Sequence, residues 1–299
     1  MFRWFQRQIR PAAVCLVLVF VLLAAGCSNG SHPAGGARSG QIVVKVLDIG
    51  QGDAILIRAG GQVTLMDTGD TPTKEKLAAI LRKEGITTVD KLILTHPHSD
   101  HIGGATTVLE DFAVKQVYDS GQTTTTATYR KYMQAVKKKK IPFTVLAAGD
   151  SVDIGGGASL RILSPQKPFF TEDNGLLDLN NNSIVAKLIF GSFSMLLTGD
   201  SEKPSELRMI KNNGGELKSS VLKVAHHGSN TSSSPEFLKA VAAEAAIISA
   251  GVDNDYHHPH PVTLKKLENQ KSKVYRTDRN GTVTVTSDGK MYTIDKEKE

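Results

Sequence analysis

The chain has 299 residues, 40% of them hydrophobic, and 27 glycines, which excludes a disordered or fibrous protein and suits a loop-rich α/β domain. The formal net charge is +6, from 36 basic and 30 acidic side chains. Arg3, Arg7 and Arg10 belong to the leader described next, so the remainder carries 36 − 3 = 33 basic side chains and a net charge of +3. This excess is too small to predict nucleic-acid binding by itself.

The first forty residues are predicted to lie outside the folded domain. The three arginines precede an apolar run over residues 12–25, which Gly26 and Cys27 follow. This order is typical of a secretory signal, and the run is shorter than the ~20 residues that a membrane-spanning helix needs. We expect residues 1–26 to be a lipoprotein-type signal peptide, Cys27 to carry the lipid, and residues 27–40 to form a flexible tether. An uncleaved N-terminal anchor is the alternative, and either one holds the domain on a membrane outside the cytoplasm.

The two cysteines, Cys15 and Cys27, both fall in this N-terminal region. Residues 28–299 therefore contain no thiol, which excludes a disulfide framework, a thiolate nucleophile and a thiolate metal ligand. Any metal must be held by histidine and carboxylate side chains.

The elements of the domain, expected over residues 41–299, alternate in two successive sets. In the first set we expect a helix at 73–84 and strands at 42–47, 54–57, 63–66 and 91–94. In the second set we expect helices at 205–211, 235–243 and 261–269, strands at 183–190, 193–197, 221–225 and 246–249, and a C-terminal strand and hairpin around Asp288-Gly289. Two such sets predict two packed sheets with helices outside, a four-layer αββα sandwich of the α/β class. The lysines at 137–140 are interpreted as a solvated helix end, with a phosphate contact as the alternative.

A cluster of histidines directly follows the strand expected at 91–94. Residues 95–104 read Thr-His-Pro-His-Ser-Asp-His-Ile-Gly-Gly. The end of the strand aims His96 and His98 into one pocket, and Asp100 and His101 reach it from the start of the next helix. Imidazole and carboxylate are the ligands that Zn²⁺, Mn²⁺ or Fe takes when no thiol is present. The spacing predicts two adjacent metal subsites, and a set of surface histidines is the alternative.

The cluster resembles the hallmark of the metallo-β-lactamase superfamily, and the resemblance extends over about residues 41–290. It implies the αββα fold, hydrolase activity and two divalent metal ions, Zn or Mn. Asp67, in Met-Asp-Thr-Gly, matches the family's aspartate that supports the ligands from behind. Asp200, in Leu-Leu-Thr-Gly-Asp, matches the carboxylate that bridges the two metals, whose two oxygens can hold ions about 3.5–4 Å apart.

A narrower set of motifs is similar to the extracellular hydrolase domain of ComEC-type DNA-uptake channels. These motifs occupy residues 48–54, 180–183, 198–200, 224–229 and 256–259. No apolar run beyond the leader approaches membrane-spanning length, so the chain resembles that domain alone. His227 is the expected last metal ligand, with His226 behind it or facing substrate, although either could bind. Many superfamily members have a further histidine between the cluster and the bridging aspartate, but residues 102–225 contain none, so one metal is expected to have fewer protein ligands.

Other residues near these motifs are expected behind the metals or against the substrate. Asp53 either lines the site or caps its turn, and His258 is expected to protonate the leaving group. Ser229 either contacts phosphate or belongs to a helix-capping segment. The remaining candidates for the second shell or the substrate are Asn182 and Ser183.

The resemblance implies a phosphodiesterase that cleaves DNA outside the membrane with a metal-activated hydroxide, oriented by Asp100. A separate uptake channel is an expected partner. One alternative is a phosphoesterase for a cell-envelope component such as phosphocholine. Another is a non-catalytic metal-binding module, and a true β-lactamase comes last.

Overall fold

The computed structural model describes residues 40–299. The predicted signal peptide, Cys27 and nearly all of the predicted tether lie outside the described residues. Within residues 40–299, no helix is both long enough and apolar enough to cross a membrane.

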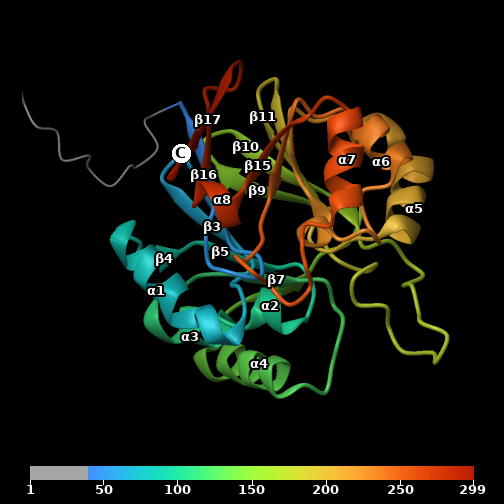
Figure 1. The fold of residues 1–299 in the computed structure, drawn as a ribbon. Helices are drawn as coiled ribbons and strands as arrows, with labels where there is room; N and C mark the ends of the chain where they lie inside the picture. The colour runs from blue at the N-terminus through green and yellow to red at the C-terminus, as the bar shows by residue number, and fades with distance from the viewer. Residues whose placement is uncertain (1–39) are drawn as a thin grey trace, which may run out of the picture. The chain divides into compact units, whose positions relative to one another are not determined.

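Two large sheets are packed against each other (Figure 1). The first has eight strands in the order β17-β16-β1-β2-β3-β5-β7-β8, and the second has seven in the order β15-β14-β13-β12-β11-β10-β9. The strands of the first sheet are β1 Ile42–Val46, β2 Ile55–Ala59, β3 Gln62–Met66, β5 Lys91–Leu94, β7 Val117–Asp119, β8 Phe143–Val145, β16 Val283–Ser287 and β17 Tyr292–Lys296. Those of the second are β9 Ser151–Gly155, β10 Ala158–Ser164, β11 Val185–Phe190, β12 Phe193–Leu197, β13 Val221–Lys223, β14 Ala245–Ile248 and β15 Lys273–Arg276. A separate pair joins β4 Thr88–Val89 to β6 Ala113–Val114.

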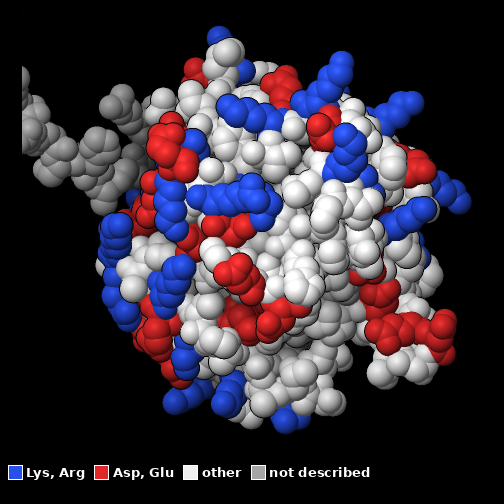
Figure 2. Space-filling model, in the orientation of Figure 1, with Lys and Arg blue, Asp and Glu red and all other residues white. Residues whose placement is uncertain are grey.

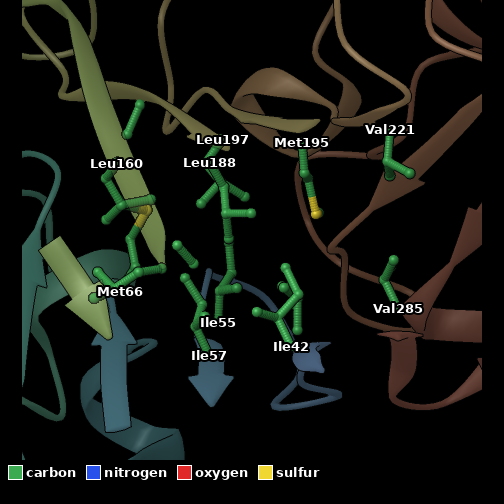
Figure 3. Close-up of a cluster of buried hydrophobic side chains, with 14 of the residues drawn as sticks. Ile42, Ile55, Ile57, Met66, Leu160, Leu188, Met195, Leu197, Val221 and Val285 are labelled. Atoms are coloured by element: carbon green, nitrogen blue, oxygen red, sulfur yellow. The ribbon is translucent and has the colours of Figure 1, made fainter. Parts of the chain in front are cut away.

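The core between the sheets follows from the alternation of side chains along the strands. In β1, Ile42, Val44 and Val46 are buried, whereas Val43 and Lys45 between them are only half-buried. Ile42 and Ile57 from the first sheet meet Leu160 and Leu188 from the second in one cluster, which Figure 3 shows. The contact of the two inner faces makes this cluster the centre of the sandwich.

Helices cover the outer face of each sheet. The first sheet carries α1 Lys74–Lys83, α3 Ala105–Asp111 and α4 Ala127–Lys139, and the second carries α5 Lys203–Asn213, α6 Pro235–Val241 and α7 Pro261–Asn269. Leu77 of α1 packs in one cluster with Leu92 of β5, and Phe237 of α6 packs in another with Leu222 of β13. These helices complete four layers, which confirms the αββα sandwich.

The expected elements are present, most of them within one to three residues of their predicted ends. The hairpin over Asp288-Gly289 joins β16 to β17, and the lysines at 137–139 form the exposed last turn of α4, as expected. Six elements between residues 105 and 164 were not predicted at all: α3 and the strands β6 to β10.

The order of the parallel strands brings the predicted motifs together. β3, β5 and β7 run parallel, as do β12, β13, β14 and β15. His96 follows the carboxyl end of β5, Asp200 that of β12, and the His226-His227 pair that of β13. Ligand sites in α/β proteins lie beyond the carboxyl ends of parallel strands, and these residues meet there.

Candidate metal centre

Asp200 lies at the centre of a group of histidines. Its Oδ1 is 3.2 Å from Nε2 of His101 and 3.7 Å from Nε2 of His227. Its Oδ2 is 3.8 Å from Nε2 of His96 and 3.8 Å from Nε2 of His226. Imidazole nitrogens from two segments, far apart in the sequence, therefore face the two oxygens of one carboxylate.

Two further residues complete the predicted set. Asp100, in the short helix α2 Ser99–Ile102, has its Oδ2 3.2 Å from Nε2 of His227. Nδ1 of His98 lies 3.0 Å from Nε2 of His96. The ligand atoms of Asp100, His101, Asp200 and His227 all lie within 4.8 Å of one another, so these four residues are able to hold a metal ion.

Each of the four histidines that face Asp200 also contacts a second oxygen. This contact is made by Nδ1, the ring nitrogen that points away from Asp200. Metal-binding histidines characteristically have such a partner, which fixes the tautomer and the orientation of the ring. The four contacts are His101 Nδ1 to Asp67 Oδ2 at 2.8 Å, His227 Nδ1 to the Ser249 carbonyl at 3.0 Å, His96 Nδ1 to Thr95 Oγ1 at 3.1 Å, and His226 Nδ1 to Glu202 Oε1 at 3.1 Å.

The loops around this centre pack so closely that their backbones are in direct contact at two glycines. A Cβ atom on Gly52, where φ is +115°, would lie 2.4 Å from the carbonyl oxygen of Asp100. A Cβ on Gly103 would lie 2.1 Å from the backbone nitrogen of Thr71. Side chains at these positions would push the loops away from the metal-binding helix, which explains the glycines in both motifs.

A fully buried ion pair lies behind His227. Lys223 donates from Nζ to Asp53 Oδ2 at 2.8 Å, and both side chains are at most 1% exposed. The other oxygen, Asp53 Oδ1, is 3.6 Å from Nδ1 of His227. Of the two interpretations of Asp53, the structure therefore places it behind the site, and the sequence analysis did not identify Lys223.

The carboxylates and histidines shift one another's protonation. Burial lowers the pKa of His101, but the carboxylates of Asp200, Asp67 and Asp100 outweigh burial and raise it well above its usual range. Burial raises the pKa of Asp200, but His101 and His227 outweigh burial and lower it well below its usual range. Burial and the neighbouring His101 lower the pKa of His96, so its ring is held neutral. The neutral His96 ring and the ionised Asp200 carboxylate thus have the forms that bind a metal, whereas His101 must lose a proton when a metal binds.

The unsatisfied atoms of the site test whether a metal fits. Nε2 of His101 and Oδ1 of Asp200 are both buried and have no hydrogen-bond partner among residues 40–299, although they face each other. Four carboxylates are gathered here, and Lys223 neutralises one of them. A divalent cation would satisfy both orphaned atoms and balance the charge, so the donor set fits a metal.

The metallo-beta-lactamase superfamily profile matches residues 47–252 of this chain. The chain belongs to the metallo-beta-lactamase superfamily. Solved structures of the fold agree with this assignment. The metallo-beta-lactamase fold protein YhfI from Bacillus subtilis superimposes with a TM-score of 0.53 at 14% identity, covering 79% of this chain and 96% of that one. Igni18, a metallo hydrolase from Ignicoccus hospitalis, gives a TM-score of 0.52 at 16% identity, covering 81% of this chain and 98% of that one.

Curated relatives confirm the narrower resemblance to the competence-type domain within the superfamily. ComE operon protein 3 of Bacillus subtilis is 34% identical over 90% of this chain and 35% of its own length. Competence protein ComA of Neisseria gonorrhoeae is 30% identical over 91% of this chain and 35% of its own length. The chain thus spans about a third of the length of these relatives.

Three of the residues predicted behind the metals or against the substrate lie as follows. Ser183 Oγ accepts a hydrogen bond from the backbone nitrogen of Asp200 at 3.3 Å. Asn182 bonds to the backbone of Phe170 and Asp178, so it shapes the loop behind the site and does not face the cavity. Ser229 bonds to Thr231, which in turn contacts His226, and this also places it behind the site.

A cavity of about 270 Å³ opens over the centre. Its lining consists of Gln51, His98, Ser99, Asp100, Asn180, Asp200, His226, His227, Tyr256 and His258. Burial and the neighbouring histidines lower the pKa of His258 to about 4, so its ring is neutral near pH 7. The sequence analysis did not predict Glu202, which lies two residues after Asp200 and contacts His226, and it included Gln51 and Tyr256 only as members of the motifs at 48–54 and 256–259.

Proposed function

We propose that this protein is a metal-dependent phosphodiesterase that cleaves DNA. The observation that carries the proposal is the convergence of Asp100, Asp200 and the histidine rings beneath a cavity of about 270 Å³. The name of one relative, Competence protein ComA, refers to competence, which supports DNA as the substrate.

Different residues around the cavity can take different roles in such a reaction. Divalent cations held here would supply an activated water and neutralise charge on phosphate oxygens. Asp100 is a quarter exposed, so its carboxylate can accept a hydrogen bond from the attacking water and orient it. His258 lines the cavity as a neutral ring, and it can therefore hydrogen-bond the scissile phosphate or the leaving group.

The charge around the cavity limits how DNA can bind. The described residues that line it include no Lys or Arg. Figure 2 shows that on one face of the molecule the basic side chains are dispersed among acidic ones and form no continuous track. A site with few cationic side chains neutralises few phosphates, so its affinity for DNA falls little as the salt concentration rises. We therefore propose that the site contacts a short stretch of one strand.

Hydrolysis of two substrates tests the proposal. The full-length protein, purified in detergent, is assayed with Mn²⁺ and with Zn²⁺ on DNA and on bis-(p-nitrophenyl) phosphate. The Asp100→Ala, His101→Ala double variant is compared with His257→Ala, which removes an exposed histidine outside the cavity. Cleavage of both substrates by the wild type and by His257→Ala, but not by the double variant, is the expected result.

The other outcomes separate the alternatives. Cleavage of the small diester alone would move the substrate to a cell-envelope component such as phosphocholine. Bound metal with no cleavage of either substrate would support a non-catalytic metal-binding module. Hydrolysis of nitrocefin would support a β-lactamase instead.

We also propose that the protein acts outside the cytoplasm, tethered to the membrane by lipid on Cys27, with a separate uptake channel as its partner. The arginines, apolar run and Gly26-Cys27 of the sequence support the tether. Labelled palmitate should be incorporated by the wild type and by Cys15→Ala but not by Cys27→Ser. Equal labelling of all three would exclude Cys27 as the lipid site, and co-purification with a membrane channel tests the partner.

A further inference from the structure

The two oxygens of Asp200 have unequal sets of expected ligands. Around Oδ1 lie Asp100, His101 and His227, here called the first subsite. Around Oδ2 the superfamily motifs supply only His96 and His98, because residues 102–225 contain no histidine. With Asp200 itself, the second group has three ligands and the first has four, and four protein ligands are the usual number at a closed zinc site.

His226 lies where that ligand is missing. Its Nε2 is 3.8 Å from Asp200 Oδ2, the same distance as Nε2 of His96 from that oxygen. Two ligands about 2.1 Å from one metal, at angles of 90–109°, lie about 3.0–3.4 Å apart, so each ring must move closer to Asp200 Oδ2 to share an ion with it. His226 also lines the cavity beside His98.

The support behind His226 matches that behind the other histidines. Nδ1 of His226 lies 3.1 Å from Glu202 Oε1, and Glu202 also accepts a hydrogen bond from Thr231 Oγ1 at 3.0 Å. A carboxylate that holds the far nitrogen of a ring is the usual partner of a metal-binding histidine.

The backbone at His226 and His227 provides an independent observation. Both residues have left-handed conformations, with φ of 49° and 53°, which non-glycine residues rarely adopt. Strain of this kind persists at functional sites, where the surrounding structure enforces it. Here it turns two consecutive side chains toward opposite oxygens of Asp200, His227 toward Oδ1 and His226 toward Oδ2.

We propose that His226 is a metal ligand that replaces the histidine missing from the superfamily pattern. With His96, His98 and Asp200 Oδ2 it forms the second subsite, and Glu202 orients its ring. Asp200 would then lie between two subsites that each have three other ligands. The inference rests on the metal-dependent hydrolysis proposed above, but metal binding can be measured without it.

Metal stoichiometry tests this assignment. The full-length protein in detergent is stripped with chelator and titrated with Zn²⁺, and bound metal is counted by mass spectrometry and by calorimetry. The wild type should bind two ions, and His226→Asn should bind one with wild-type affinity and the second at least about tenfold more weakly. Asn tolerates the left-handed backbone at this position. The matched control is His257→Asn, because His257 is exposed and has φ of 56°; it should bind two ions.

Each outcome decides the assignment. Two ions bound by His226→Asn with wild-type affinity would overturn it, as would a wild type that binds a single ion. If His226→Asn kept both ions but lost hydrolysis, His226 would be a substrate contact and not a ligand. If His226→Asn does not fold, the same titration is made with His226→Gln. A wild type that binds two ions and cleaves no phosphodiester would refute the proposed function while supporting this site.

Discussion

The two subsites differ in how deeply their supporting residues are buried. Behind the first, Asp67, Asp53 and Lys223 are at most 1% exposed, and they fix His101 and His227 from within the protein. In the second, His96 and its partner Thr95 are equally buried, but His226 and Glu202 are 23% and 22% exposed, and His98 is half-buried. Apart from the quarter-exposed Asp100, the first subsite is enclosed, so we expect it to rearrange little when metal binds, whereas the exposed side of the second should move toward its ion. A pre-organised site binds more tightly, so we expect the ion of the first subsite to be retained and that of the second to exchange.

The largest effect is expected at the carboxylate that both subsites share. Asp200→Asn removes the charge that faces four imidazole nitrogens, so both ions should bind weakly. Hydrolysis of bis-(p-nitrophenyl) phosphate should fall by about 10³-fold or more in kcat/KM. The control is Asp295→Asn, on an exposed position of β17. A variant that lost only one ion would show that the subsites do not depend on a common bridge.

The buried ion pair should make the first subsite costly to disturb. Lys223→Met leaves the Asp53 carboxylate buried without its cation, which destabilises a protein by about 3–5 kcal/mol. The Asp53→Asn, Lys223→Met double variant removes the unpaired charge and should regain most of this loss in urea unfolding, while binding metal more weakly than the wild type. If the single variant were as stable as the wild type, the pair would not hold the first subsite together.

Asp119 offers a contrasting buried carboxylate, near the second subsite. Asp119 lines a small internal cavity together with His96. Its oxygens accept hydrogen bonds from the Gly121 backbone and the Tyr132 hydroxyl, and no basic side chain among residues 40–299 forms an ion pair with it. Burial raises the pKa of Asp119 from 3.8 to about 6. The folded protein therefore holds this proton more tightly than the unfolded chain. Its contribution to stability is present below about pH 4 and is lost as the pH rises to about 6.

Asp119→Asn should remove this loss. A shift from 3.8 to about 6, at 1.36 kcal/mol per unit, amounts to about 3 kcal/mol above pH 6. The gain in unfolding free energy of the variant over the wild type should therefore be about 2 kcal/mol larger at pH 8 than at pH 4. An equal change at both values would mean that Asp119 does not titrate between them.

How far the sequence could predict the molecule depends on how local each signal is. The strand Lys91–Leu94 and the helix Pro261–Asn269 were predicted with the observed boundaries, because the first ends at the histidine cluster and the second begins with proline. The segment from 105 to 164 gave weaker signals. β7 has only three residues, too few for its alternation to stand out in the sequence, and the three residues of β8 are all exposed and do not alternate.

The same distinction holds in the site. His96, His98, Asp100 and His101 lie within six residues, so their spacing alone indicates a metal site. The pairing of Lys223 with Asp53 joins positions 170 residues apart, and nothing in either local sequence indicates it. A lysine within a buried strand is a weak signal that becomes meaningful only when its partner is known.

A variant of Glu202 tests the exposed support of the second subsite, and its expected effect is the smallest of these predictions. Glu202→Gln keeps the size of the side chain but removes the charge that holds Nδ1 of His226. Loss of such a partner typically weakens metal binding by about 10–100-fold, so calorimetry should show the second Zn²⁺ binding more weakly by this factor while the first is unchanged. The matched control is Glu216→Gln, because Glu216 is an exposed glutamate that pairs with Arg161 and contacts no histidine of either subsite. Equal weakening of both ions would mean that Glu202 supports the centre as a whole, and the contrast between a firm and an exchangeable subsite would then fail.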